Sequence, residues 1–288
     1  MFWQTYKTTL KNLFRSVVFW LTLVIVILVA LEKVLSYTYG YYDMALNETI
    51  YDTDPRFVLS YSTYIKQCFN SLATLLSYAV PLFAAISAVL IINRDYGDNF
   101  YEIEKAGGIK ISSYIMGRIT ALVSVCFLTT LAVNLVFFHI YVFTRGGVKE
   151  MGIWDYIFDS TWRLLLMNLC RSLPCIIFFI GLTYSLGTLF KSGIPAAIGG
   201  LGYALFAFAA YMVLRLQLKD MQFYFDYLSP IPNKLNMYLY MIGTEGFENF
   251  IQSQNTSLLH ALTCMGIMAG TGALCVLISY LRMRKRTV

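Results

Sequence analysis

The sequence predicts an all-α polytopic membrane protein, and composition and hydropathy are the observations that predict it. Of the 288 residues, 58% are hydrophobic and 13% are charged, and the mean hydropathy is +0.62. An average soluble domain carries about a quarter charged residues, so this composition excludes a soluble enzyme. The apolar residues form long unbroken runs instead of the alternating segments of about ten residues found in outer-membrane strands, which excludes a transmembrane barrel.

Six apolar stretches are predicted to cross the membrane, because a spanning helix needs about 20 mostly apolar residues. Together they make residues 1–288 a single transmembrane domain with six transmembrane helices. The predicted spans cover residues 16–38, 70–93, 114–144, 164–190, 193–214 and 258–281.

Residues 1–15 are predicted to form an amphipathic elbow helix at the membrane interface. Lys7, Lys11 and Arg15 share one face. A helix of this kind lies in the headgroup region with its bases toward anionic lipid, so membrane lipids are expected partners. The alternative is an extension of the first span. The apolar residues of the segment recur at spacings of three and four: Phe2, Trp3, Tyr6, Leu10, Leu13 and Phe14.

The positive charges predict the orientation of the chain in the membrane. Lysine and arginine are denser in the short segments that lie inside if the N-terminus is cytoplasmic, so the positive-inside rule places both termini in the cytoplasm. We therefore expect a multi-pass protein of the cell membrane. The net charge of +6 follows from this topology, and no nucleic-acid partner is expected.

Several catalytic and energy-coupling motifs are missing from the sequence. The predicted span cores hold no Asp or Glu, which argues against a proton pump or an intramembrane aspartyl protease. The two histidines, His139 and His260, cannot form a HExxH metal site. A Walker A loop needs Gly-Lys before Ser or Thr, and neither Lys7 nor Lys191 follows a glycine. We expect no catalytic residue, metal or cofactor in this chain, and any active transport would draw its energy from another chain.

The charged loop at residues 94–112 is the predicted cytoplasmic coupling loop. It contains a helical segment from Asp98 to Ala106, with Asp98 placed to cap its start and Gly107 and Gly108 at its end. A short capped helix at the inner membrane face suits a docking contact. The alternative is an ordinary solvated connector.

The outer side carries a second unusual segment, residues 215–257, which is predicted to be re-entrant. It is apolar and aromatic, and Pro230 and Pro232 break it into pieces shorter than a span. A surface loop is the alternative.

The candidates for a substrate path are Arg171, His139 and Asn134. For Arg171, and equally for Arg118, the favoured interpretation is that the side chain snorkels to the headgroups.

A GxxxG motif, Gly266 to Gly270, lies in the sixth predicted span. Two glycines one helical turn apart permit close approach of another helix. In a six-helix chain this favours packing within the chain over dimerisation.

The order of these parts resembles the membrane subunit of type-two ATP-binding-cassette (ABC) exporters. Those permeases have an elbow helix, six spans, a coupling helix after the second span and re-entrant helices after the fifth. The run from Arg94 to Gly97, Arg-Asp-Tyr-Gly, is similar to the family's Arg-Glu-x-Gly, and Gly117-Arg118 stands where the family often has Gly-Lys. One departure is Gly107-Gly108-Ile109, where the family commonly has a proline.

The resemblance implies how the chain would work with other subunits. A separate nucleotide-binding ATPase would carry ATP and Mg²⁺, and a second permease subunit, identical or related, would complete a homo- or heterodimer. The permeases of the family contain no catalytic residues. The residues implied to couple this chain to the ATPase are Asp98, Phe100, Tyr101, Glu102, Glu104 and Lys105.

The expected function is therefore that of a permease subunit in an ATP-driven exporter. The tyrosine-rich outer loops suit an amphipathic or hydrophobic cargo, such as a peptide, bacteriocin, drug or lipid-like molecule. The alternative is a membrane scaffold or sensor subunit that transports nothing.

Overall fold

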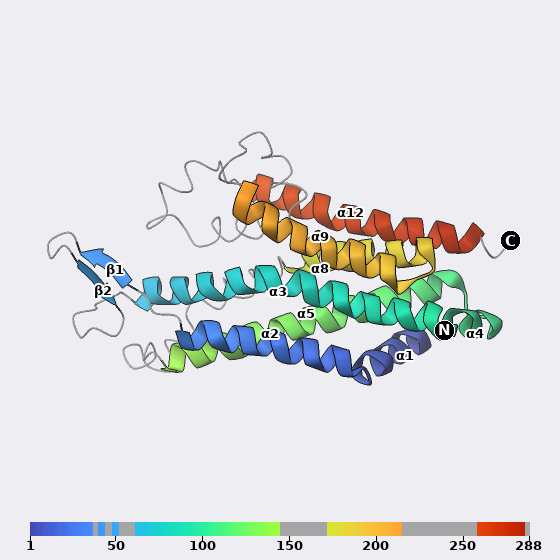
Figure 1. The fold of residues 1–288 in the computed structure, drawn as a ribbon, viewed down its shortest axis with the longest axis horizontal. Coiled ribbons are helices and arrows are strands. Elements are labelled where there is room, and N and C mark those ends of the chain that lie inside the picture. Colours follow the sequence, from blue (N-terminus) through green and yellow to red (C-terminus); the bar gives the residue numbers. More distant parts are fainter. Residues whose placement is uncertain (37–39, 44–47, 52–60, 145–171, 215–257, 286–288) are drawn as a thin grey trace.

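The computed structural model describes residues 1–36, 40–43, 48–51, 61–144, 172–214 and 258–285, and Figure 1 shows their arrangement. This described part contains eight helices and one two-stranded hairpin. The helices are α1 (Phe2–Phe14), α2 (Val17–Ser36), α3 (Tyr61–Gly97), α4 (Phe100–Ala106), α5 (Ile111–Thr144), α8 (Ser172–Phe190), α9 (Gly193–Leu214) and α12 (Leu258–Lys285). The hairpin pairs β1 (Gly40–Asp43) with β2 (Glu48–Tyr51).

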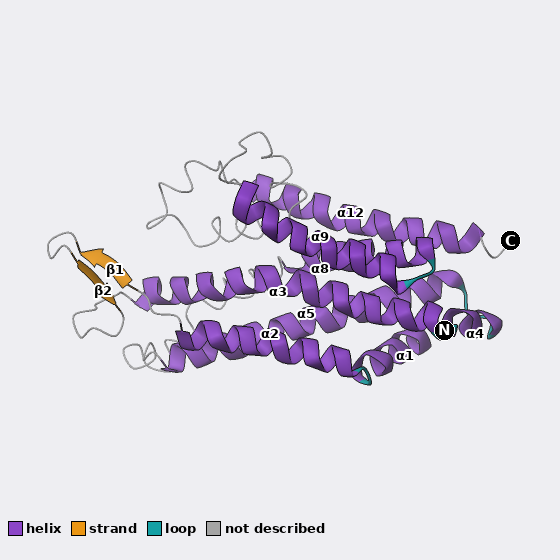
Figure 2. Cartoon of the chain, viewed as in Figure 1, coloured by secondary structure: helices purple, strands orange, loops and turns teal. Residues whose placement is uncertain are grey.

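The long helices form a bundle whose members run in alternating directions along one axis (Figure 1). The N-terminus, α4 and the last turn of α12 lie at one end of this axis, and the hairpin lies at the other. We call the first of these the α4 end. Figure 2 shows that the described residues are helical apart from the hairpin and short connectors.

Several helices are long and apolar enough to span a membrane, as in a multi-pass membrane protein. Four qualify on their own among the described residues: Ala79–Gly97, Ile111–Phe137, Ser172–Phe190 and Met265–Lys285. A fifth qualifies if α1 and α2 count as one bent span. The apolar part of α9 that the structure describes, Gly193–Phe206, is shorter than a span. The count of six spans stays a prediction.

The helix bounds differ from the predicted spans mainly where polar residues flank an apolar run. The helix α3 begins at Tyr61 and continues to Gly97, and α12 continues to Lys285. Backbone hydrogen bonding propagates past the last apolar residue, because adding one residue to an existing helix costs little. Residues 164–171 of the fourth predicted span and the whole re-entrant segment, 215–257, lie outside the described residues.

The hairpin is an element that the hydropathy pattern did not predict. It is antiparallel and pairs Gly40 with Tyr51 and Tyr42 with Thr49. Tyrosine and threonine favour strands over turns, which agrees with the composition of this tyrosine-rich loop.

The first two helices meet at a bend of 69°. The indole nitrogen of Trp20 donates a hydrogen bond to the Phe14 carbonyl at 2.7 Å, so a side chain of α2 holds the last turn of α1. This geometry favours a separate helix over a straight extension of the first span.

The contact face of α1 is its small polar side. Thr5, Thr9, Asn12 and Leu13 are buried, and α1 packs mainly against α5. Gly117 of α5 makes room for it, because a Cβ at that position would lie 2.9 Å from the Thr5 Cβ. The aromatic side chains of Trp3 and Phe14 stay exposed.

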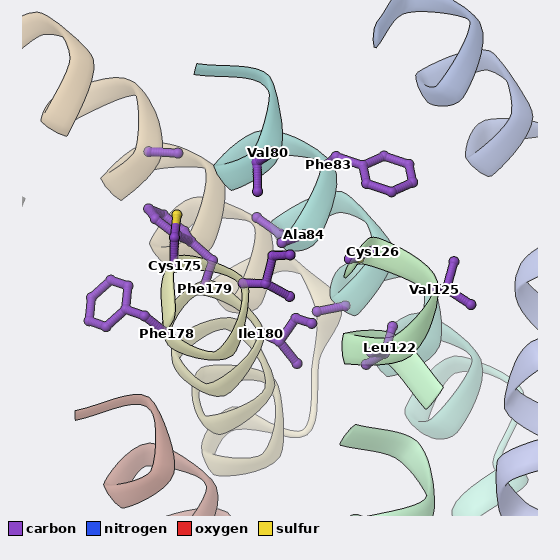
Figure 3. Packing of buried hydrophobic residues seen from close by; sticks show 14 of the residues in the cluster. Val80, Phe83, Ala84, Leu122, Val125, Cys126, Cys175, Phe178, Phe179 and Ile180 are labelled. Atoms are coloured by element: carbon purple, nitrogen blue, oxygen red, sulfur yellow. The ribbon is translucent and has the colours of Figure 1, made fainter. Parts of the chain in front are cut away.

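The apolar core lies where α3, α5 and α8 meet. Figure 3 shows Ile180 of α8 directed toward α5, whereas Phe83 of α3 points to the side of α2, where its ring lies 5.6 Å from the Phe19 ring. Alanines along α3 are fully buried, which lets neighbouring helices approach. A smaller buried cluster occupies the α4 end and joins residues from α3, α4, α5, α8, α9 and α12: Ile92, Tyr101, Tyr114, Ile115, Tyr184, Ala196 and Met283.

The helices α8 and α12 approach closely through glycines that the GxxxG motif does not include. A Cβ on Gly272 would lie 2.7 Å from the Ile177 carbonyl oxygen, and a Cβ on Gly181 would clash with the Gly272 backbone. Around Gly266 and Gly270, no described atom lies within 4 Å of an added Cβ. The expectation that the GxxxG motif packs within the chain is therefore wrong for the described residues, because the contact lies on another face of α12.

Candidate functional site

The helix α4 is the core of the candidate site, and its termini explain its length. It begins at Phe100 after Asn99, which has a left-handed backbone with φ of 53° and makes no capping hydrogen bond through its side chain. The expected cap by Asp98 is therefore wrong, since the helix starts later. The helix ends at Ala106, as the glycines predicted, and Gly108 takes a φ of 77° that suits glycine.

The predicted coupling residues divide between two faces of this segment. Tyr101 is buried and Glu104 is 10% exposed at its side chain, so these two face the bundle. Glu102 and Lys105 are exposed. Asp98 is also exposed, just before the helix. We call Tyr101, Glu104 and Phe100 the inner face of α4.

The outward surface of α4 includes an apolar residue that sequence reasoning missed. Ile103 is 62% exposed and lies beside Glu102. Single exposed apolar residues are common on protein surfaces, so Ile103 adds apolar area beside the charged residues but does not by itself indicate a contact. We call Asp98, Glu102, Ile103 and Lys105 the outer face of α4.

Arg118 of α5 holds the inner face in place. Its side chain is fully buried, and its guanidinium donates to an Asp95 carboxylate oxygen at 2.7 Å. The other terminal nitrogen donates to the Thr9 hydroxyl at 2.9 Å. The interpretation that Arg118 snorkels to the headgroups is therefore wrong, because its polar partners lie inside the protein.

The same guanidinium also meets α4. It lies 3.9 Å from a Glu104 carboxylate oxygen and 5.3 Å from the centre of the Phe100 ring. The Tyr114 ring, on α5 itself, is 5.0 Å away. Cations attract the faces of aromatic rings at such distances, and more strongly where water is excluded. Arg118 thereby contacts side chains from α1, α3 and α4 at once.

The cluster carries two carboxylates for one buried guanidinium. Among the described residues, four of its buried polar atoms have no hydrogen-bond partner: Asp95 Oδ2, Glu104 Oε2, Tyr114 Oη and Arg118 Nε. Burial raises the pKa of the Glu104 carboxyl, and the charge of Arg118 lowers it in part. The Arg118 guanidinium is thus paired with one Asp95 oxygen, while the other Asp95 oxygen and one Glu104 oxygen are acceptors without a donor among the described residues.

The predicted substrate-path residues do not join this cluster. Asn134 is buried within α5, where its side-chain amide donates to the Thr130 carbonyl at 2.8 Å. The His139 ring lies 2.6 Å from the Leu135 carbonyl oxygen. Arg171 lies outside the described residues. A role for these three residues in a substrate path stays a prediction.

The sequence signals for this site were present but incomplete. The motif from Arg94 to Gly97 and the pair Gly117-Arg118 contain both partners of the buried ion pair. Thr9 gave no signal, because a threonine in an amphipathic helix counts only as a weakly polar residue.

Comparison of the chain with protein-family models, curated proteins and solved structures finds no match.

Proposed function

We propose that this chain is the membrane-spanning permease subunit of an ABC exporter, working with a separate ATPase chain. The observation that supports it most is the two-faced helix α4. Its inner face is tied to a buried ion pair, and its outer face presents charges and Ile103 at one end of the bundle. Such a helix suits transfer of force from a soluble partner to the spans.

Transfer of force needs a rigid joint between α4 and the long helices. The ion pair of Arg118 and Asp95 joins α5 to the end of α3, and Glu104 brings α4 to the same guanidinium. Tyr101 adds an apolar anchor, since its ring packs 5.3 Å from the Tyr114 ring. A push on the outer face would therefore reach both helices through short, buried contacts.

The cargo is proposed to be amphipathic or hydrophobic, such as a peptide, bacteriocin, drug or lipid-like molecule. The described long helices carry mostly apolar side chains, and hydrophobic compounds enter such a bundle at low desolvation cost. Under this proposal two permease subunits, identical or related, flank the cargo path.

The test is co-expression with the ABC ATPase encoded nearest to this gene, followed by reconstitution of the purified complex into vesicles. Asp98→Lys with Glu102→Lys should weaken association of the ATPase by about ten-fold or more, which corresponds to roughly 1.4 kcal/mol. The reason is that both substitutions reverse charge on the outer face and leave the buried cluster intact.

Glu48→Lys is the matched control, because it reverses the same charge in the hairpin at the far end of the bundle. It should leave association and ATP hydrolysis unchanged. If the complex forms and hydrolyses ATP equally well after reversal at Asp98 and Glu102, the coupling role is wrong. If no ATPase associates with the unmodified chain, the alternative of a scaffold or sensor subunit is favoured.

A further inference from the structure

We propose that the exposed face of α1 is a binding surface for anionic phospholipid headgroups. This lipid surface of α1 consists of Trp3, Lys7, Lys11, Phe14 and Arg15, all exposed. It is independent of any transport activity.

The buried residues of α1 determine which way this surface faces. Thr5, Thr9 and Asn12 contact the bundle. At 3.6 residues per turn, Lys7 and Phe14 lie almost opposite Thr5, on the side away from α5. Trp3 is 66% exposed and Phe14 is 47% exposed: their rings contact neighbouring aromatic rings of α1 and α2, and much of their area stays open on this side.

The charge of the surface selects its partner. Residues 1–16 contain three cationic side chains and no Asp or Glu, so nothing within the helix neutralises them. The exposed Arg282 and Lys285 of α12 and the exposed Asp98 and Glu102 of α4 lie at the same end of the bundle, so the positive charge specific to this surface comes from α1 itself. Clusters of this kind attract anionic headgroups within a Debye length.

The neighbouring apolar residues favour a lipid leaflet over an acidic soluble protein. The aromatic end of the surface continues directly into exposed apolar side chains of α2, including Val17 and Leu21. The occupant must therefore present negative charge beside hydrocarbon. The bend of 69° turns α1 away from the direction of α2, and the bond from Trp20 to the Phe14 carbonyl holds that turn. Tryptophan at such a boundary is typical of the headgroup region.

The surface is also linked to the buried cluster. The opposite side of the same helix carries Thr9, whose hydroxyl accepts a hydrogen bond from Arg118. A lipid that holds α1 in place therefore also holds Thr9, a hydrogen-bond partner of Arg118. The Arg118 guanidinium in turn lies 3.9 Å from Glu104 of α4.

The test uses Trp3 as a reporter in reconstituted full-length protein. With Trp20→Phe, Trp154→Phe and Trp162→Phe, Trp3 is the one tryptophan left in the chain. Its fluorescence is measured in phosphatidylcholine vesicles that contain either brominated phosphatidylglycerol or brominated phosphatidylcholine as a minor component. We expect stronger quenching by the brominated phosphatidylglycerol, and we expect added salt to reduce the difference.

The three cationic side chains of the lipid surface are then neutralised in one variant and replaced by other cationic side chains in a second. Lys7→Gln, Lys11→Gln and Arg15→Gln should lower the preference for phosphatidylglycerol by about five-fold for each cation at low salt. The control Lys7→Arg, Lys11→Arg and Arg15→Lys keeps the charge and should keep the preference.

A second measurement keeps all four tryptophans, because Trp20→Phe removes a hydrogen bond at the bend. Native mass spectrometry of the unmodified chain, purified from mixed vesicles, compares bound phosphatidylglycerol with bound phosphatidylcholine. Retention of phosphatidylglycerol that the triple glutamine variant loses supports the proposal. Equal quenching by the two brominated lipids, or equal retention by both proteins, overturns it.

Discussion

Loss of the Arg118 guanidinium should destabilise the protein more than loss of its partner Asp95. In Arg118→Met, the Asp95 carboxylate stays buried without the ion pair that it makes at 2.7 Å. Removing one partner of a buried pair costs about 3–5 kcal/mol, because the remaining charge is left uncompensated. In Asp95→Asn, the guanidinium keeps the Thr9 hydroxyl and lies 3.9 Å from Glu104. The cost is then nearer that of one charged hydrogen bond, roughly 1.5–3 kcal/mol.

The double variant Arg118→Met with Asp95→Leu separates pairing from packing. Replacing a buried ion pair by apolar side chains is often neutral, so the double variant should be more stable than Arg118→Met alone. The coupling energy between the two sites should exceed about 2 kcal/mol.

The assay is reversible unfolding in mixed micelles by titration with sodium dodecyl sulfate, followed by tryptophan fluorescence and circular dichroism. The unmodified protein, Arg118→Met, Asp95→Leu and their double variant form the cycle, and Asp95→Asn is measured beside them at the same pH and detergent composition. Two effects that add within about 0.5 kcal/mol would refute the reasoning, as would an Asp95→Asn variant less stable than Arg118→Met.

Three further predictions concern a helix contact, a turn and the pH dependence of stability, and each is measured by the same unfolding assay. Gly272→Ala should cost about 1–3 kcal/mol because its Cβ would meet the Ile177 carbonyl, whereas Gly266→Ala, in open space, should stay within about 0.5 kcal/mol; equal effects would contradict the contact. Lys191→Gly should stabilise the protein by up to about 1 kcal/mol, since Lys191 is exposed with a φ of 55°, and a loss of stability would show that its side chain matters. Because the pKa of Glu104 is raised, the folded state binds its proton more readily, so stability should fall as the pH rises from the ordinary carboxyl value of 4.5 through the raised one. Glu104→Gln should flatten that part of the pH profile, and an unchanged profile would contradict this assignment.

The sequence predicts the existence of elements better than their contacts. Long apolar runs predict helices because a helix needs about 20 apolar residues to cross the bilayer and pairs its backbone groups within the segment, whereas the strands of a barrel are shorter and alternate in polarity. The helix α9 begins and ends where it was expected, at Gly193 and Leu214. The hairpin was not expected, since a short strand leaves only a weak signal in hydropathy.

The buried cluster shows why a contact is harder to predict than an element. Asp95 and Arg118 lie 23 residues apart in the chain, at the ends of two helices separated by α4. Whether such residues pair or face the headgroups depends on how α3 and α5 turn about their axes, and hydropathy constrains that rotation weakly. The face of α1 that packs on the bundle was not predicted, because Thr5 and Thr9 are polar by composition, although Thr5 is small enough to pack against Gly117.

The glycine contact between α8 and α12 has a mechanical consequence for the bundle. Backbone lies directly against backbone at Gly181 and Gly272, so no flexible side chain is available there to absorb sliding or rotation. These two helices should move as one rigid body, and the Arg118 cluster should make a second one from α1, α3, α4 and the start of α5. Between them at the α4 end, Tyr184 and Met283 lie in one buried cluster with Tyr101 and Tyr114. A sliding movement between the two groups would have to displace this cluster and also the Ile92 side chain of α3, which packs against Gly187 of α8.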